Sequence, residues 1–135
     1  MATLKLEIVT PEAKTYSEDV EMVTLPGVEG EMGIFPMHVP LMTQIVPGEI
    51  AVRKGGQDFF LAVGEGFVEV TGESVSILTD MAIKAGDIDE VKAEEARKRA
   101  EARLQEKLGD EESASVQAAL AHALAQLQVK RRQRH

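Results

Sequence analysis

One histidine and two glutamates lie within a short stretch rich in glycine and proline, residues 27 to 48, which reads GVEGEMGIFPMHVPLMTQIVPG. Imidazole and carboxylate groups exchange protons readily, so Glu31 and His38 could form a general acid/base pair. An activated pair usually has a third group that orients the base, and this one has no evident third member. The competing hypothesis is a rigid docking surface, in which the glycines allow close backbone approach and the prolines stiffen the chain. The residue types favour docking over catalysis.

The standard motifs of catalytic and phosphate-binding sites are missing from the sequence. It contains no GxxxxGK[ST], GxGxxG, HExxH or GxSxG pattern, and it has no cysteine for a disulfide or a thiolate metal site. A net charge of -8 would repel nucleic acid and anionic lipid. No run of 18 apolar residues and no signal-like N-terminus is present. We therefore expect no direct membrane insertion and no export, so a membrane role would require a protein partner.

The elements that must position these residues fall into two regions of different composition. Residues 1 to 86 hold 13 acidic and 5 basic residues, whereas residues 87 to 135 hold 10 of each. All 5 prolines and 10 of the 11 glycines lie at or before Gly86. This change predicts two domains, residues 1–86 and residues 87–135.

The first region alternates turn residues with short apolar runs such as LKLEIV, VEMVTL, DFFLAV and SVSIL. Several runs alternate apolar and polar residues, so Leu4, Leu6 and Ile8 would face one way and Lys5 and Glu7 the other. Many short strands at this spacing predict an antiparallel β-sandwich or a flattened barrel. The prolines between residues 36 and 47 restrict that segment to loops and sheet edges.

The second region predicts two helices. The first begins after Asp87 as its N-cap and stops at Gly109. Its apolar stripe is narrow and rich in alanine: Ala93, Ala96, Ala100, Leu104 and Leu108. Alanines bury little area, so we expect modest packing energy along this stripe.

The second predicted helix covers residues 113 to 129, with Ser113 as its cap. Its expected buried face consists of Val116, Leu120, Ala123, Leu124 and Leu127. The short connection predicts an antiparallel hairpin, and its thin apolar seam predicts that the hairpin can open. The sequence then ends in KRRQRH, either a frayed basic tail or a segment attracted to an acidic protein surface.

Charged residues flank the alanine stripe of the first helix. Lys92, Arg99 and Arg103 lie near one another on it, with Asp89 one turn before Lys92. Such a row is most often a solvated helix face with weak ion pairs. The more specific alternative is that these cations bind a phosphate group.

The opening stretch also carries a family resemblance. Residues 30 to 41, GEMGIFPMHVPL, followed by Thr43 and by Pro47 and Gly48, resemble the GELGxxPxHxPLxTxxxPG signature of the ε subunit of F-type ATP synthase. FVEV after Gly66, ILTDMAI, GDIDEVKAEEARKRAEARL and the uncharged last helix follow in that family's order. The resemblance covers essentially the whole chain.

This resemblance implies a non-catalytic rotor subunit with an N-terminal β-sandwich and a C-terminal helical hairpin. The sandwich would bind the γ subunit and the ring of c subunits, with Glu31 and His38 in the part turned towards the ring. The hairpin would permit turnover when folded and inhibit ATP hydrolysis when extended along γ into the α/β hexamer. Lys130, Arg131, Arg132 and Arg134 would then face acidic segments of the catalytic subunits.

Some members of this family bind ATP through an IDxxRA motif and further arginines on both helices. Here the motif reads IDEVKA, residues 88 to 93, so Lys92 replaces the arginine and loses its bidentate geometry. Asp89 and Arg99 match, whereas the second helix offers His122 and Gln126. We expect weak or absent nucleotide binding and no other cofactor or metal.

Two other functions remain as alternatives at this point. One is a stand-alone enzyme that uses Glu31 and His38, and the other is an adaptor whose hairpin recruits an unrelated protein. For the location we expect the cytoplasmic face of a bacterial plasma membrane, as a peripheral part of the ATP synthase complex. A plastid-encoded thylakoid form would share the same features.

Overall fold

A computed structural model describes residues 2–12 and 14–133 of the chain. The first part consists of short strands, as the turn spacing predicts. They are β1 (Leu4–Val9), β2 (Lys14–Val20), β3 (Met22–Gly27), β4 (Gly30–Ile34), β5 (Leu41–Ile45), β6 (Gly48–Lys54), β7 (Gln57–Val63), β8 (Gly66–Val70), β9 (Ser74–Thr79) and β10 (Ala82–Lys84). After them come a 3-10 turn, η1 (Ala85–Asp87), and two helices, α1 (Glu90–Leu104) and α2 (Asp110–Gln133).

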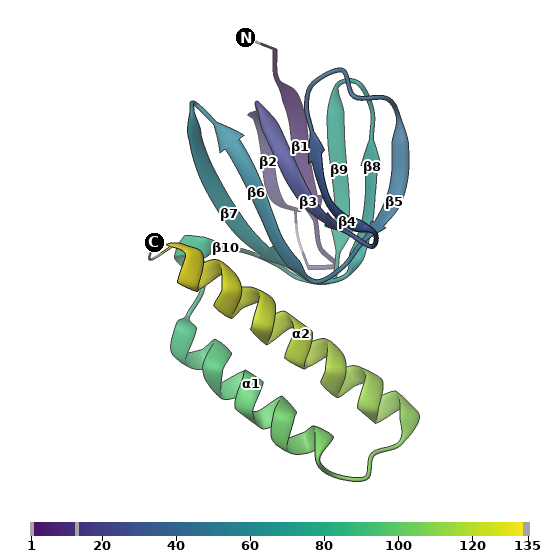
Figure 1. Cartoon of the computed structure of the whole chain (residues 1–135), viewed down its shortest axis with the longest axis vertical. Coiled ribbons are helices and arrows are strands. Elements are labelled where there is room, and N and C mark those ends of the chain that lie inside the picture. The colour runs from purple at the N-terminus through teal and green to yellow at the C-terminus, as the bar shows by residue number, and fades with distance from the viewer. Residues whose placement is uncertain (1, 13, 134–135) are drawn as a thin grey trace.

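The strands form one sheet that curls over its own apolar face into a sandwich (Figure 1). Their order is β10-β7-β6-β3-β5-β8-β9-β1-β2, and β4 pairs with β3 alone. The predicted antiparallel sandwich is confirmed with one exception, because β1 and β9 run parallel. A parallel pair needs a long connection, and here most of the sandwich separates the two strands in sequence.

Alternation along the strands builds the core. Leu4, Leu6 and Ile8 of β1 are buried and Lys5 is exposed, as their spacing predicts. They join large aliphatic side chains from most of the other strands in one continuous cluster. The prolines at positions 36, 40 and 47 lie outside the strands, since proline cannot donate to a sheet ladder.

The helix boundaries correct three predictions. Asp89, not Asp87, caps α1: its side chain accepts a hydrogen bond from the Lys92 N–H at 3.1 Å, while Asp87 belongs to η1. Helix α1 ends at Leu104, before Gly109, in a tightened turn where the Gln105 N–H donates to the carbonyl of residue 102. Helix α2 begins at Asp110, so Ser113 lies inside its first turn and is not a cap.

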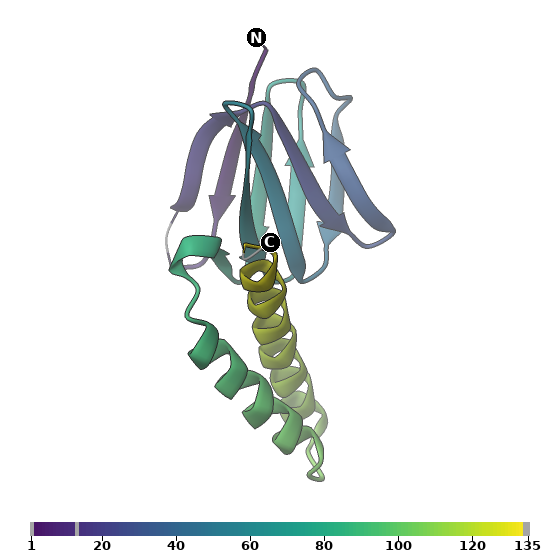
Figure 2. The ribbon, with the colours of Figure 1, turned by 60° about the vertical axis from the view of Figure 1, so that its left-hand side comes forward.

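The described residues contain no helix that is long and apolar enough to cross a membrane. Helix α2 instead lies between α1 and the end of the sheet formed by β6 and β7, while α1 lies away from the sheet (Figures 1 and 2). Because α2 has neighbours on two sides, its buried positions do not follow a single stripe. Ala123 and Leu127 are buried as predicted, but so are Ala125 and Val129, and Leu124 is 48% exposed against expectation.

Candidate functional site

The glycine- and proline-rich stretch forms β4, the loop of residues 35–40 and β5. Glu31 is exposed on β4, opposite Pro26 of β3, and the second edge of β4 has no hydrogen-bonded strand within residues 2–12 and 14–133. Met37 holds a positive φ of 68°, and its N–H donates to the Gly72 carbonyl at 2.8 Å. The loop is thus fixed to the turn between β8 and β9.

Glu31 and His38 do not meet. Glu31 lies near the turn between β3 and β4, at the end of the sandwich that faces the helices, and the 35–40 loop lies at the opposite end (Figure 1). The distance from Glu31 to Ile34 alone spans about 10 Å of extended strand. His38 instead places Nδ1 2.7 Å from its neighbour's carbonyl oxygen. The acid/base hypothesis is therefore wrong in this geometry, whereas a partner lying along the free edge of β4 could contact both residues.

Apolar side chains project from the 35–40 loop. Phe35, Met37 and Val39 are 58%, 84% and 71% exposed. Leaving three apolar side chains in water on a loop that is held in place is unfavourable unless another molecule covers them. These three residues, the loop patch, form the first candidate docking surface.

A second exposed apolar surface lies on the outer face of the sheet. Phe67 of β8 is paired with Leu78 of β9, and Met42 of β5 lies diagonally across from Phe67 on the same face. Their exposed fractions are 54%, 59% and 69%. We call these three residues the sheet patch. Sequence reasoning missed it, although apolar residues at outward positions of alternating strands were a readable signal.

The helical hairpin is held by small side chains. Ala93 and Ala100 are the buried residues of α1, and α2 is the element against which that helix packs. On its other side α2 contributes Ala125 and Val129 to a small cluster with Ala62, Ala85 and Ile88. The α1 side of α2 meets alanines, as the alanine stripe predicts, while α2 itself also buries the larger Leu127 and Val129.

The predicted basic tail is not frayed over the part that the structure describes. Lys130, Arg131 and Arg132 form the last turn of α2, where cations complement the helix dipole, and Arg134 lies outside the described residues. Lys130 Nζ donates to the Ala85 carbonyl at 3.2 Å, and Arg131 lies 3.8 Å from Glu94. The hydrogen bond from Arg97 lowers the pKa of the Glu94 carboxyl, and the charge of Arg131 lowers it further.

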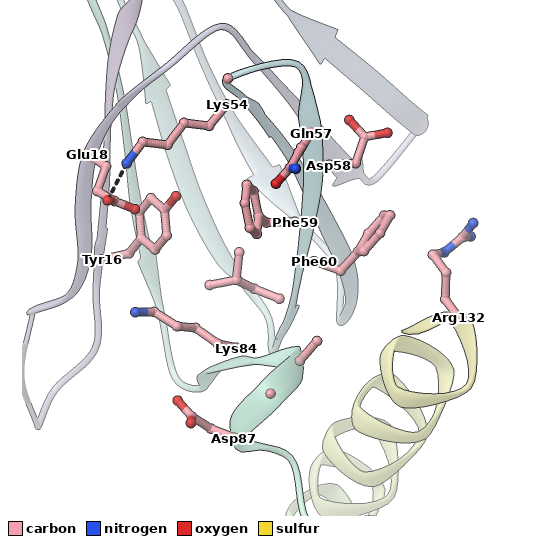
Figure 3. Close-up of a pocket in the computed structure, with 14 residues that line it drawn as sticks. Tyr16, Glu18, Lys54, Gln57, Asp58, Phe59, Phe60, Lys84, Asp87 and Arg132 are labelled. Carbon is pink, nitrogen blue, oxygen red and sulfur yellow. Dashed lines mark hydrogen bonds and ion pairs between the residues drawn. The ribbon is translucent and has the colours of Figure 1, made fainter. Parts of the chain in front are cut away.

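Arg132 connects α2 with the sheet. It is 2.7 Å from the carboxylate of Glu49, whose side chain is only 11% exposed. Its guanidinium also lies 5.5 Å from the centre of the Phe60 ring, within cation–π range (Figure 3). In the folded hairpin, all three described cations of the last turn are therefore engaged within the chain.

Comparison with known proteins agrees with this architecture. The model of the ATP synthase delta/epsilon chain β-sandwich domain matches residues 3–85, and that of the delta/epsilon chain long α-helix domain matches residues 87–131. The chain belongs to the ATP synthase delta/epsilon chain family. Its curated relatives include the ATP synthase epsilon chains of Laribacter hongkongensis, 41% identical over 94% of this chain and 92% of that one, and of Halorhodospira halophila, 43% identical with the same coverage.

Solved structures share the fold of this delta/epsilon chain family member. A chain in a cryo-EM structure of the Euglena gracilis mitochondrial ATP synthase, comprising OSCP, F1 and c-ring, superimposes with a TM-score of 0.77 at 26% identity, covering 93% of this chain and 79% of that one. A chain in the cryo-EM structure of the central stalk and c-ring of the Tetrahymena thermophila mitochondrial ATP synthase superimposes with a TM-score of 0.65 at 12% identity. The match covers 96% of this chain and 97% of that one. The second likeness shows the fold alone.

The residues that would form the family's nucleotide site lie on both helices of the hairpin. Asp89 is used as the α1 cap, and Lys92 and Arg99 are exposed about 10 Å apart along the helix axis. His122 instead lies 3.2 Å from Asp80. Gln126 donates to the sulfur of Met81 at 3.5 Å.

A cleft in this family member lies elsewhere, where β2 faces the β6–β7 hairpin and β10 (Figure 3). It has a volume of about 930 Å³ and is lined by as many acidic as basic side chains. The Lys54–Glu18 ion pair spans it, and Lys84 lies 5.7 Å from the centre of the Tyr16 ring. Burial raises the pKa of the Tyr16 hydroxyl, and Glu18 raises it further through a hydrogen bond. With no net charge, the cleft does not select for an anion.

Proposed function

We propose that the chain is a non-catalytic central-stalk subunit of a proton-translocating F-type ATP synthase, peripheral to a bacterial plasma membrane on its cytoplasmic face. The observation that carries this proposal is the family relationship over both parts of the chain, to proteins named ATP synthase epsilon chain. The similar chain from Euglena comes from an assembly that contains F1 and a c-ring. A relationship this complete favours a stalk subunit over an unrelated adaptor.

In this proposal the sandwich, residues 1–86, docks on the γ subunit and on the c-ring. The loop patch and the sheet patch supply exposed apolar surface for these contacts. Glu31 and His38 flank the free edge of β4 and would add polar contacts there. Docking in this way would help couple the rotation of the ring to the catalytic hexamer.

A binding measurement with purified γ tests the docking role. The unmodified chain should form a stable complex, and Phe67→Ser should weaken it about tenfold or more, because buried aromatic residues dominate interface energies. Val91→Ser is the matched control, since Val91 is 67% exposed but belongs to α1. No complex with γ, or equal weakening by both substitutions, would contradict this role.

The hairpin, residues 87–135, would be regulatory. Folded as described here it permits turnover, and extended along γ into the α/β hexamer it blocks ATP hydrolysis. The small side chains with which α1 meets α2 support such a two-state element, because only a few kcal/mol need separate the two packings. Extension would free Lys130, Arg131 and Arg132, together with Arg134, to face acidic segments of the hexamer.

A truncation tests the regulatory role. Deleting residues 109 to 135 removes the second helix and its cations, and should raise the ATPase rate of a reconstituted complex. Measuring ATP synthesis by the same complexes controls for assembly, since an intact sandwich should still couple the rotor. An ATPase rate that stays at the level of the full-length chain would contradict this part of the proposal.

We also propose that ATP binding by the chain is weak or absent. Asp89, Lys92 and Arg99 are the residues that would take part. The Asp89 side chain is already bound as the cap of α1, and Lys92 lacks the planar fork with which an arginine holds a phosphate. Calorimetric titration of the full chain with ATP should show no micromolar affinity. A micromolar dissociation constant would overturn this expectation.

A further inference from the structure

The sulfur atoms of this chain all belong to methionine, since the sequence holds 6 methionines and no cysteine. Among the methionines that the structure describes, two are far more exposed than the others. Met37 is 84% exposed and Met42 is 69% exposed, whereas Met22, Met32 and Met81 are partly buried. Each exposed methionine belongs to one of the two candidate docking surfaces, Met37 to the loop patch and Met42 to the sheet patch.

The backbone that presents these two side chains is fixed. The Met37 N–H donates to the Gly72 carbonyl at 2.8 Å, which ties the loop to the turn between β8 and β9. Met42 lies inside β5 and is paired with Glu69 of β8. Both thioether groups are therefore open to solvent in the folded chain, so a small dissolved oxidant can reach them without any unfolding.

The other described methionines are shielded by neighbours. The methyl group of Met22 packs over Gly33, where an added Cβ would be only 3.0 Å from it. Met32 packs against the core of the sandwich. The sulfur of Met81 accepts a hydrogen bond from Gln126 at 3.5 Å. An oxidant in solution should reach these three sulfurs more slowly than the two exposed ones.

We infer that Met37 and Met42 are a peroxide-sensitive modification site of the unassembled chain, and that oxidation of Met42 weakens docking on γ. The thioether sulfur attacks one oxygen of hydrogen peroxide, so that a sulfur–oxygen bond forms while the oxygen–oxygen bond breaks. The second oxygen leaves with both hydrogens as water. The sulfur is oxidised and the peroxide is reduced, and the product is the polar side chain methionine sulfoxide.

The sulfoxide would change the surface and leave the fold intact. An added oxygen on an exposed side chain stays in water, and neither methionine belongs to the core of the sandwich. Docking would instead bury the oxygen of oxidised Met42 beside Phe67 and Leu78, where a polar group without a hydrogen-bond partner is unfavourable. This consequence rests on the proposed docking of the sheet patch on γ.

Peroxide treatment of the full chain tests the site. Fragmentation mass spectrometry assigns the added oxygen to individual methionines over time. Met37 and Met42 should be oxidised several times faster than Met22, Met32 and Met81, and the difference should disappear in a denaturing concentration of urea. The circular dichroism of the chain oxidised at both positions should match that of the untreated chain. Equal rates in the folded chain, or loss of the fold on oxidation, would overturn the inference.

Binding to γ tests the effect, with peroxide removed before γ is added. The oxidised chain should bind γ about tenfold more weakly than the untreated chain, because an apolar contact of methionine size is lost. Each variant is then compared with itself before and after peroxide. Met42→Leu has no thioether at the sheet patch and should lose this sensitivity, whereas the matched control Met37→Leu should keep it. Sensitivity that persists in Met42→Leu would contradict the inference.

Failure of this inference can be told apart from failure of the docking role. If the untreated chain forms no complex with γ, the docking role is wrong, and the oxidation rates of the folded chain still decide whether the two methionines are the modification site. If the untreated chain binds γ and the oxidised chain binds it equally well, the docking role stands and the inference is wrong.

Discussion

The sandwich and the hairpin are both packed, but with side chains of different size. The sandwich core contains large aliphatic residues that are fully buried, among them Leu6, Ile50 and Ile77. The hairpin buries alanines along α1, and on α2 its large buried side chains are Leu127 and Val129. A buried leucine or isoleucine contributes about 1.5 to 3 kcal/mol, and alanine much less. Unfolding the sandwich should therefore require more free energy than detaching the hairpin from it.

The largest expected effect comes from the sandwich core. Leu6→Ala should lower the free energy of unfolding by about 2 to 5 kcal/mol, because Leu6 is 0% exposed and its removal leaves a cavity. Leu124→Ala removes the same atoms from a side chain that is 48% exposed. This substitution should change the free energy of unfolding by less than about 0.5 kcal/mol. Chemical denaturation followed by circular dichroism measures both. Similar losses would show that the sandwich core does not contribute more to stability than this helical position does.

A smaller effect should come from the junction of hairpin and sheet. Val129→Ala removes two carbons from a fully buried position of α2, which should favour opening of the hairpin by about 1 to 2 kcal/mol. The sandwich should keep its stability, since its main core does not include this residue. Hydrogen exchange, read separately in α2 and in the strands, distinguishes the two regions. Faster exchange throughout would mean that the two regions unfold as one unit.

The smallest effect concerns the open side of the sandwich. Hydrogen bonding to Lys54 lowers the pKa of the Glu18 carboxyl below its usual value of 4.5. Its contribution to stability is therefore present above about pH 4.5 and lost as the pH falls through the lowered pKa. Between about pH 6 and pH 3 the free energy of unfolding of Glu18→Gln should therefore fall by a few tenths of a kcal/mol less than that of the unmodified chain. The effect is small because the ion pair is exposed. Unfolding midpoints between pH 3 and pH 6 would show this, and an unchanged slope would contradict it.

The spacing of apolar residues predicted the strands of the sandwich and the helices of the hairpin, because in both elements neighbouring positions along the chain determine which side chains are buried. The parallel pairing of β1 with β9 is a long-range choice that no local pattern encodes. The exposure of Leu124 was missed for a similar reason, since a helix with neighbours on two sides has no single apolar stripe. Asp87 was predicted as the cap of α1, but it belongs to the 3-10 turn that precedes the helix, and Asp89 is the cap instead.

The candidate sites depend still more on tertiary structure. Glu31 and His38 are close in sequence, but an extended strand carries them apart. Asp80 and His122 are 42 positions apart, and only the docking of α2 brings them together. The sheet patch could have been predicted, because Phe67 and Leu78 interrupt the polar side of alternating strands. The docking role of Glu31 and His38 and the inhibitory role of the last-turn cations stay predictions.

In the proposed opening of the hairpin, the arrangement of the two helices makes them leave the sheet together. Helix α1 follows the sandwich in the chain, but it rests on α2 and is otherwise joined to the sheet through residues 85–89. Once α2 lifts away, α1 has no surface to stay on, so the pair should swing out together about that short pivot. The arm released this way is about 36 Å long, given the 24 residues of α2. In the proposed opening, both helices should accordingly move as one unit.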